Sequence, residues 1–182
     1  MRAAKLSIIL LLISLLAACG FKLRGSAELP GYKLPFATIA LSLAPTSEFY
    51  AQLKRSIEAS SPGTKVVDIK DAEAILTVLN DSSQKIILSL NAAGRTVEFR
   101  LLRTFSFRVN ATGAAAPAVP PIEYIPPTTI SVRRDITFSD DLVLSKESEE
   151  ALLQRDMQSD LVQQLMRRLA TAKAQPVKVD AE

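Results

Sequence analysis

The stretch QKIILSLNAAGRTVEFRLLRTFSFRV, residues 84–109, decides the fold. Two runs rich in aliphatic, aromatic and β-branched residues flank NAAG at 91–94, which predicts a β-hairpin closed by a tight turn. In the second arm polar and apolar side chains alternate, so one face points to a core and the other to water or a partner. The apolar set is Val97, Phe99, Leu101, Phe105, Phe107 and Val109, and the polar set is Thr96, Glu98, Arg100, Thr104, Ser106 and Arg108. Arg103 falls on the apolar side, which requires either a bulge there or a buried stem whose guanidinium reaches out.

Strand and helix patterns surround this hairpin. Residues 36–43, FATIALSL, alternate with period two and predict a half-buried strand. Phe49, Leu53 and Ile57 then recur at every fourth position, which predicts a helix with one apolar stripe. Further strands are expected at 64–69, 74–79 and 128–138. The mature chain is therefore expected to mix α and β structure.

The second half of the chain predicts a loop and a long helix. Residues 110–127 hold half of the ten prolines, and because proline cannot donate to a strand ladder we expect a long exposed loop. Ser145 is expected to cap a helix whose first turns carry acidic residues. Its packing stripe consists of Leu153, Met157, Leu161, Val162, Leu165, Met166 and Leu169. Residues 175–182 are expected to be a disordered tail.

The first eighteen residues have the pattern of an export leader. Arg2 and Lys5 precede an apolar run over 6–16, and small residues follow it. A transmembrane anchor is the alternative, but the run is shorter than the roughly 20 residues that cross a bilayer. Removing the leader lowers the formal charge from +3 to +1, since 20 basic residues then face 19 acidic ones. This balance gives little support for nucleic-acid binding.

Cys19, the single cysteine, follows Leu16-Ala17-Ala18 directly. This arrangement resembles a lipobox, at which bacterial lipoprotein precursors are acylated and cleaved. The resemblance implies a mature chain that begins at Cys19 with an S-diacylglycerol and an N-acyl group. Three acyl chains would form an essentially permanent membrane anchor.

Residues for catalysis are scarce. The chain has no histidine and no second cysteine, which removes the common nucleophile systems and the usual zinc sites. Its six glycines form no phosphate-binding loop. Carboxylates could supply an acid and a base, as in glycosidases, although helix capping explains them better; they are Asp140, Asp141, Glu147, Glu149 and Glu150. We therefore expect a binding or scaffolding protein, with no enzymatic activity, metal or cofactor beyond the covalent lipid.

Four segments carry a family resemblance. In order, they are CGFKLRG at 19–25, the strand and helix at 36–60, the strand start at 95–99 and LVLSKESEEALLQRDMQSDLVQQLMRRLA at 142–170, and they resemble the lipopolysaccharide-assembly lipoprotein family LptE. The resemblance implies an α+β fold with two helices packed on one face of a mostly four-stranded mixed sheet, preceded by a lipoprotein signal peptide. The expected organisation is a signal peptide at 1–18, a lipidated segment at 19–34, one domain at 35–174, and the tail. The Ala/Pro-rich part at 110–121 departs from the family.

The same resemblance implies a function. Members of this family plug the lumen of the outer-membrane β-barrel LptD, help that barrel to assemble, and deliver lipopolysaccharide to the outer leaflet. An accessory lipoprotein of another envelope machine, of the barrel-insertion or secretin-pilot type, is the alternative, and a carboxylate hydrolase of envelope glycans is a second one. The first alternative would share the lipid anchor and the absence of catalytic residues, whereas the second would show turnover that is lost when Asp140, Asp141 or Glu147 is changed to the amide.

Basic residues are the candidates for ligand contact. Lys85, Arg100, Arg108 and Arg133 are expected on one polar sheet face, suited to the interior of a large barrel or to lipid A phosphates. A solvated face balanced by Glu98 and Asp135 is the alternative. Arg95 at the hairpin tip and Lys146 at the start of the last helix are the leading candidates, with Arg133 and Arg100 after them.

Overall fold

The computed structural model describes residues 33–176 except 113–120 and 138–142, and in 143–147 it describes the backbone alone. All described residues belong to one compact unit within 31–182. Cys19, Asp140 and Asp141 lie outside the described residues. None of the helices in the described ranges has the length and apolar character needed to span a membrane.

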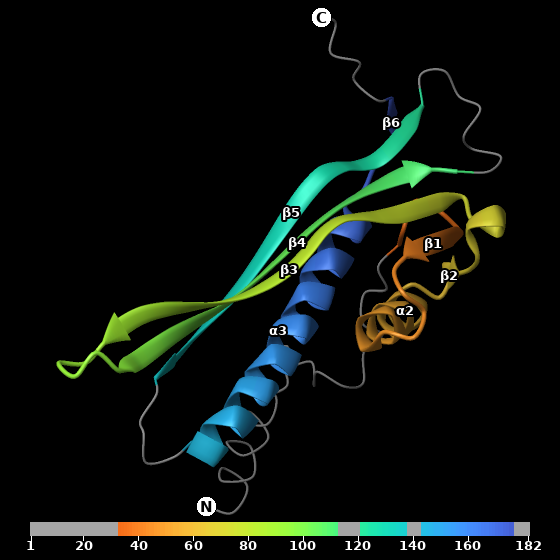
Figure 1. The fold of residues 1–182 in the computed structure, drawn as a ribbon. Coiled ribbons are helices and arrows are strands. Elements are labelled where there is room, and N and C mark those ends of the chain that lie inside the picture. Colours follow the sequence, from red (N-terminus) through yellow and green to blue (C-terminus); the bar gives the residue numbers. More distant parts are fainter. Residues whose placement is uncertain (1–32, 113–120, 138–142, 177–182) are drawn as a thin grey trace, which may run out of the picture. The chain divides into compact units, whose positions relative to one another are not determined.

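The sheet has six strands in the order β2-β1-β3-β4-β5-β6 (Figure 1). Their bounds are Thr38–Ser42 for β1, Lys65–Val66 for β2, Ala74–Leu90 for β3, Thr96–Ala111 for β4, Ile122–Thr137 for β5 and Gln175–Pro176 for β6. β1 runs parallel to β2 and β3, and the remaining neighbours are antiparallel. The expectation of a mixed sheet is confirmed, but the strand number of four is wrong. The two additional strands, β2 and β6, contain two residues each.

Two α-helices cover one face of this sheet, as expected, and the other face carries no described element (Figure 1). Helix α2 spans Glu48–Ser60 and α3 spans Val143–Ala170, while a short 3-10 helix, η1, occupies Ile69–Asp71. The Ser47 hydroxyl caps α2 by accepting a hydrogen bond from the Tyr50 N–H at 3.1 Å. Helix α3 begins two residues before Ser145, so the prediction that Ser145 caps it is wrong.

The core lies between the helices and the sheet, and it extends along the sheet as far as Leu101 and Ile136. Phe105 and Phe107 of β4 are fully buried, and the rings of Phe105 and Phe49 meet edge to face with their centroids 5.3 Å apart. The predicted stripe of α2 is buried, and on α3 burial begins at Met157 and continues to Leu169. Each such side chain contributes about 1.5–3 kcal/mol by leaving water. Toward the hairpin tip this apolar packing gives way to polar contacts.

The predicted hairpin is present, but its first arm is one strand where the sequence predicted two. Between Val78 and Asn80 the register to β4 shifts by one residue, which leaves Leu79 as a β-bulge. The bulge changes which residues face the helices, because Leu76 lies opposite Val109 while Asp81 lies opposite Phe105. The turn closes through Gly94, whose φ of 75° suits glycine.

The expected loop at 110–127 is shorter than predicted. β4 continues to Ala111 and β5 already begins at Ile122, so Pro126 and Pro127 lie within a strand. They occupy the irregular part of the β4–β5 ladder between Phe107 and Val109, where a missing N–H breaks no regular pairing. Residues 113–120 lie outside the described ranges. Gln175–Pro176, predicted as part of the tail, pairs with the start of β5.

Candidate functional site

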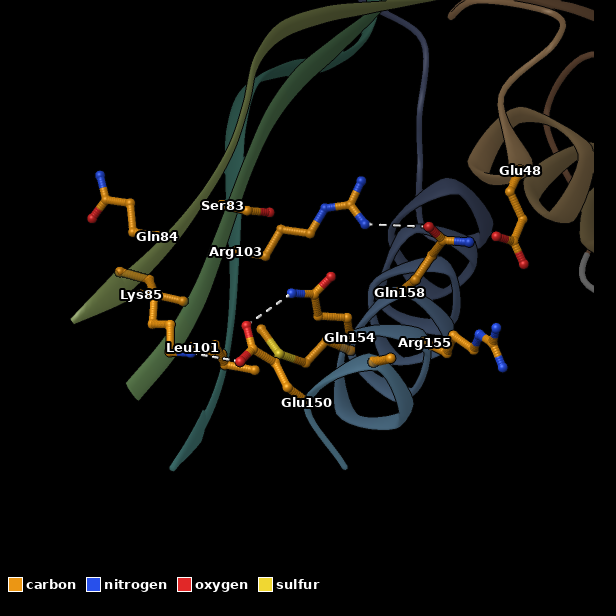
Figure 2. A pocket seen from close by; sticks show the side chains of 13 residues that line it. Glu48, Ser83, Gln84, Lys85, Leu101, Arg103, Glu150, Gln154, Arg155 and Gln158 are labelled. Atoms are coloured by element: carbon orange, nitrogen blue, oxygen red, sulfur yellow. Dashed lines mark hydrogen bonds and ion pairs between the residues drawn. The ribbon is translucent and has the colours of Figure 1, made fainter. Parts of the chain in front are cut away.

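A cleft of about 380 Å³ separates the outer half of the β3–β4 hairpin from the N-terminal half of α3 (Figure 2). We call it the hairpin cleft. Its charged lining consists of Lys85, Arg103 and Arg155 with Glu48 and Glu150, and Leu101 and Met157 contribute apolar surface. A second cavity of about 460 Å³ lies near residues 33–37 and 61–64, where Lys33 is the only charged residue in its lining. The hairpin cleft is thus the more polar of these two cavities.

Arg103 projects from β4 toward the helices. The pairing register passes Arg103 without a shift, so a bulge at this position, one of the two alternatives from the sequence, is wrong. The other alternative, a buried side-chain stem, is confirmed. Its guanidinium donates to both carboxylate oxygens of Asp81 at 3.1 and 2.9 Å, and to Gln158 at 3.4 Å. It also lies 4.9 Å from the centre of the Phe49 ring. Only 16% of the Arg103 side chain is exposed, against 32% of Asp81, so the guanidinium is the more shielded partner of this bidentate pair.

Lys85 lies on the same side. The sequence predicted it on the polar face with Arg100, and this prediction is wrong because the bulge at Leu79 places Lys85 opposite Leu101. Its ammonium group contacts Glu150 of α3 at 2.6 Å and the Phe99 ring at 4.5 Å from the centroid. Figure 2 shows this contact bridging the hairpin and the helix. The outer half of the hairpin is therefore tied to α3 by a charge pair.

Further polar contacts connect the two helices and β5. Gln158 of α3 donates to Gln52 of α2 at 2.8 Å, and Gln52 donates to Ser159 at 3.1 Å. Arg134 of β5 pairs with Asp160. Such contacts rearrange at a lower cost than buried apolar packing, because water can replace each partner. This end of the molecule is consequently the part best suited to adapting to a ligand.

The uncovered face of the sheet is polar. Arg100 donates to both oxygens of Asp135 at 2.7 and 2.8 Å, and Ser106 bonds Thr129 at 2.8 Å. The hydrogen bond from Arg100 holds the pKa of Asp135 below its ordinary range, and the charge of Arg133 acts in the same direction. The same contact raises the pKa of Arg100. Exposed side chains of Arg108 and Arg133 add positive charge to this face.

The predicted contact residues do not form one cluster. Arg100 and Arg133 lie on neighbouring strands of the uncovered face. Arg95 is exposed at the hairpin tip, where its main-chain N–H donates to the Asn91 side chain at 2.9 Å. Lys146 belongs to α3, but its side chain lies outside the described residues.

Three cleft residues of α3, Gln154, Arg155 and Gln158, were not predicted. Gln154 and Gln158 are four positions apart and so share a helix face. In Figure 2 Gln154 and Gln158 turn toward the strands, whereas Arg155 extends away from them. The four-residue spacing of Gln154 and Gln158 was the signal in the sequence that indicated a polar stripe beside the apolar one.

The cleft suits binding better than catalysis. In the described part of the chain no three acidic or sulfur side chains come together as a metal site. Glu150, one of the carboxylates considered for acid–base work, is engaged by Lys85 and by Gln154. Arginine and lysine donors beside apolar surface match an anionic group attached to a hydrocarbon.

A family model and known relatives match most of the chain. The model described as LptE, lipopolysaccharide-assembly, matches residues 36–169. Curated relatives named LPS-assembly lipoprotein LptE include one from Pectobacterium atrosepticum, 28% identical over 88% of this chain and 82% of that protein. Another, from Yersinia pestis, is 29% identical over 89% of this chain and 73% of that protein.

Solved structures agree with the fold. The solution structure of lipoprotein B from Nitrosomonas europaea is 31% identical, with a TM-score of 0.64, and covers 83% of this chain and 90% of its own. The crystal structure of rare lipoprotein B from Shewanella oneidensis has a TM-score of 0.58 at 24% identity over 74% of this chain and 94% of its own, and supports the fold alone. With a family model over 36–169 and relatives along most of its length, this chain belongs to the LptE family of lipopolysaccharide-assembly proteins.

Proposed function

We propose that this protein is the lipid-anchored plug subunit of an outer-membrane lipopolysaccharide translocon. It is held in the outer membrane by acyl chains on Cys19 and faces the periplasm. It sits within the lumen of an LptD-type β-barrel, assists the assembly of that barrel, and binds lipopolysaccharide on its way to the outer leaflet. Its role is to bind and position, with no reaction and no cofactor apart from the covalent lipid.

The uncovered polar face is the observation that carries the proposal. A sheet buries one face under helices, and a wide polar second face suits contact with a hydrophilic wall. The interior of a large barrel is such a wall, because its outward side chains are apolar and its inward ones polar. The Arg100–Asp135 pair, Arg108 and Arg133 would meet it through hydrogen bonds and ion pairs.

The hairpin end supports lipopolysaccharide binding. Lipid A combines phosphates with acyl chains, and the cleft combines Lys85 and Arg103 with Leu101 and Met157. Arg95 and Lys146 are proposed as further phosphate contacts, and Arg133 and Arg100 as weaker ones. A phosphate would take over donors that Asp81 and Glu150 now occupy.

Detergent extraction of cells that express the lipidated full chain tests the plug role. We expect an LptD-type barrel to co-purify in a one-to-one complex. Recovery of a secretin or of a barrel-insertion protein in its place would favour the alternative, another envelope assembly machine. Absence of any LptD-type barrel from the complex would refute the proposal.

A further inference from the structure

The open edge of β3 has features of a strand-pairing site. β1 pairs with β3 only as far as Thr77, and no other described strand lies on that side. From Asn80 to Ile87 the strand is regular, between the bulge at Leu79 and a second irregularity at Leu88. Its outward N–H and C=O groups are available over this length to another extended segment.

Near the hairpin tip, the side chains along this edge are apolar and exposed. Ile86 is 38% exposed, Ile87 56%, Leu88 38% and Leu90 58%. Ile86 lies beside Arg100 on the uncovered face and Ile87 beside Phe99 on the other, so each face carries an exposed apolar side chain near the tip. Large apolar groups on both faces of an exposed strand are typical of an interaction site.

The opposite edge of the sheet is protected. β6 pairs with β5 only at Ile122 and Glu123, so the rest of that edge is also open among the described strands. It carries Pro126, Pro127, and charges at Arg133 to Asp135, which are features that prevent strand pairing. The β3 edge has no proline, and its bulge lies before the regular segment. The contrast indicates that, of these two edges of the described strands, the β3 edge is the one left free to pair.

Charge defines the partner segment. The two charged residues of the edge, Asp81 and Lys85, are paired within the chain to Arg103 and Glu150. The edge therefore complements an uncharged segment. Acyl chains would leave the main-chain groups of this edge without hydrogen bonds, whereas a polypeptide strand supplies them, so a polypeptide complements the edge better than a lipid does.

We propose that an extended, uncharged, largely apolar segment of the barrel partner adds as a strand beside Asn80–Ile87. This inference rests on the proposed plug function. The inference assigns the β3 edge to the protein partner and the hairpin cleft to lipopolysaccharide, so that the two ligands contact different parts of the chain.

A matched pair of variants tests the edge. Ile87→Lys introduces a charge on the edge, while Leu152→Lys makes the same change on α3 at a residue of equal exposure, 57% against 56%. The lipidated full-length variants are compared for the amount of barrel that co-purifies in detergent. We expect about a tenfold loss for Ile87→Lys and none for Leu152→Lys, as for a residue central to an interface.

Proline variants test strand pairing itself. The backbone amides along β3 point alternately to β4 and to the open edge. One of the two variants Ser82→Pro and Ser83→Pro therefore removes a hydrogen bond between β3 and β4, and the other removes only an N–H at the open edge. The variant that keeps the wild-type unfolding midpoint identifies the edge-directed amide. We expect that variant to lose barrel capture as Ile87→Lys does.

The outcomes separate the two proposals. If wild type captures no barrel, the plug function fails and the assigned occupant fails with it. If wild type and Ile87→Lys capture equal amounts of barrel, the edge assignment alone is overturned. The same holds if Leu152→Lys lowers the amount of captured barrel as much as Ile87→Lys does. Dimerisation of the purified chain that Ile87→Lys abolishes, with unchanged barrel capture, would assign the edge to a second copy and also overturn it.

Discussion

Two arginine–aspartate pairs in this protein have the same bidentate geometry but different surroundings. The Arg103–Asp81 pair lies under the helices, whereas Arg100–Asp135 lies on the uncovered face. Asp81→Ala would leave a guanidinium that is 16% exposed without its carboxylate, and we expect it to lower the free energy of unfolding by about 2 kcal/mol. Asp135→Ala should cost clearly less, because water can solvate Arg100. Urea unfolding of both variants at neutral pH measures the difference, and equal losses would contradict it.

Asp135 also predicts how stability depends on pH. Its folded pKa is depressed by the hydrogen bond from Arg100, so the unfolded chain binds the proton more readily. The stabilisation is complete above the ordinary aspartate pKa of about 3.9 and is lost as pH falls through the lower folded value. Arg100, whose pKa is raised, stays charged throughout this range.

We therefore expect the difference in unfolding midpoint between wild type and Asp135→Asn to be largest above pH of about 5 and to shrink toward about 2. Denaturant unfolding across this range gives the curve. A difference that grew on acidification would mean that the folded pKa is raised. Glu58→Asn, on the exposed side of α2, serves as the control for removing one carboxylate.

At the scale of elements, helix α3 has two different halves. Its C-terminal half is packed in the core, where Leu165 is fully buried, while Leu152 in the other half is 57% exposed. Leu165→Ala should lower the free energy of unfolding by about 3 kcal/mol through lost transfer energy and a cavity. Leu152→Ala should change it little, because its side chain already meets water. Thermal or urea unfolding of the two variants provides the comparison.

The first half of α3 is expected to detach more easily from the sheet. Glu150→Gln keeps the side-chain size but removes the charge that holds Lys85. Because a partly exposed pair contributes at most about 1 kcal/mol, global stability should hardly change. Amide exchange at Arg100–Arg103 in the centre of the sheet should become faster by local opening, whereas Glu58→Gln should leave it unchanged. Unaltered exchange in Glu150→Gln would show that the pair does not hold the cleft closed.

Short-range patterns in the sequence predicted the elements well where one force dominated. The hairpin turn and the stripe of Phe49, Leu53 and Ile57 follow from local periodicity, and both are confirmed. The continuity of β3 could not be predicted, because its centre, NDSSQ, reads as a polar connection until β4 pairs with it. The bulge at Leu79 also depends on this pairing, and the bulge in turn determines which face of the sheet carries Lys85. Pairing between residues far apart in the sequence therefore determined the features that local patterns did not predict.

At the scale of the whole molecule, the positive charges at the cleft end predict how the ligand is recognised. Replacing both Arg95 and Lys146 with Ala should weaken binding of lipopolysaccharide to the full chain about tenfold or more, since charge-assisted bonds to phosphate are strong. Arg55→Ala with Lys70→Ala removes the same two residue types from exposed positions on α2 and η1. That control should bind normally. Equal affinity of both double variants in a direct binding assay would remove Arg95 and Lys146 from the site.

The bulge at Leu79 also determines which changes of chain length the protein can tolerate. Leu79 is the one residue in the first half of β3 without its own partner on β4, so its deletion would leave Val78 and Asp81 on their present faces. Deleting Ser83, four residues later, would invert every side chain on one side of the cut. The two single-residue deletions lie close together, but we expect them to have opposite effects on the fold. We expect this chain to keep its fold when Leu79 is deleted, whereas deletion of Ser83 would remove Lys85 and Asp81 from a common face.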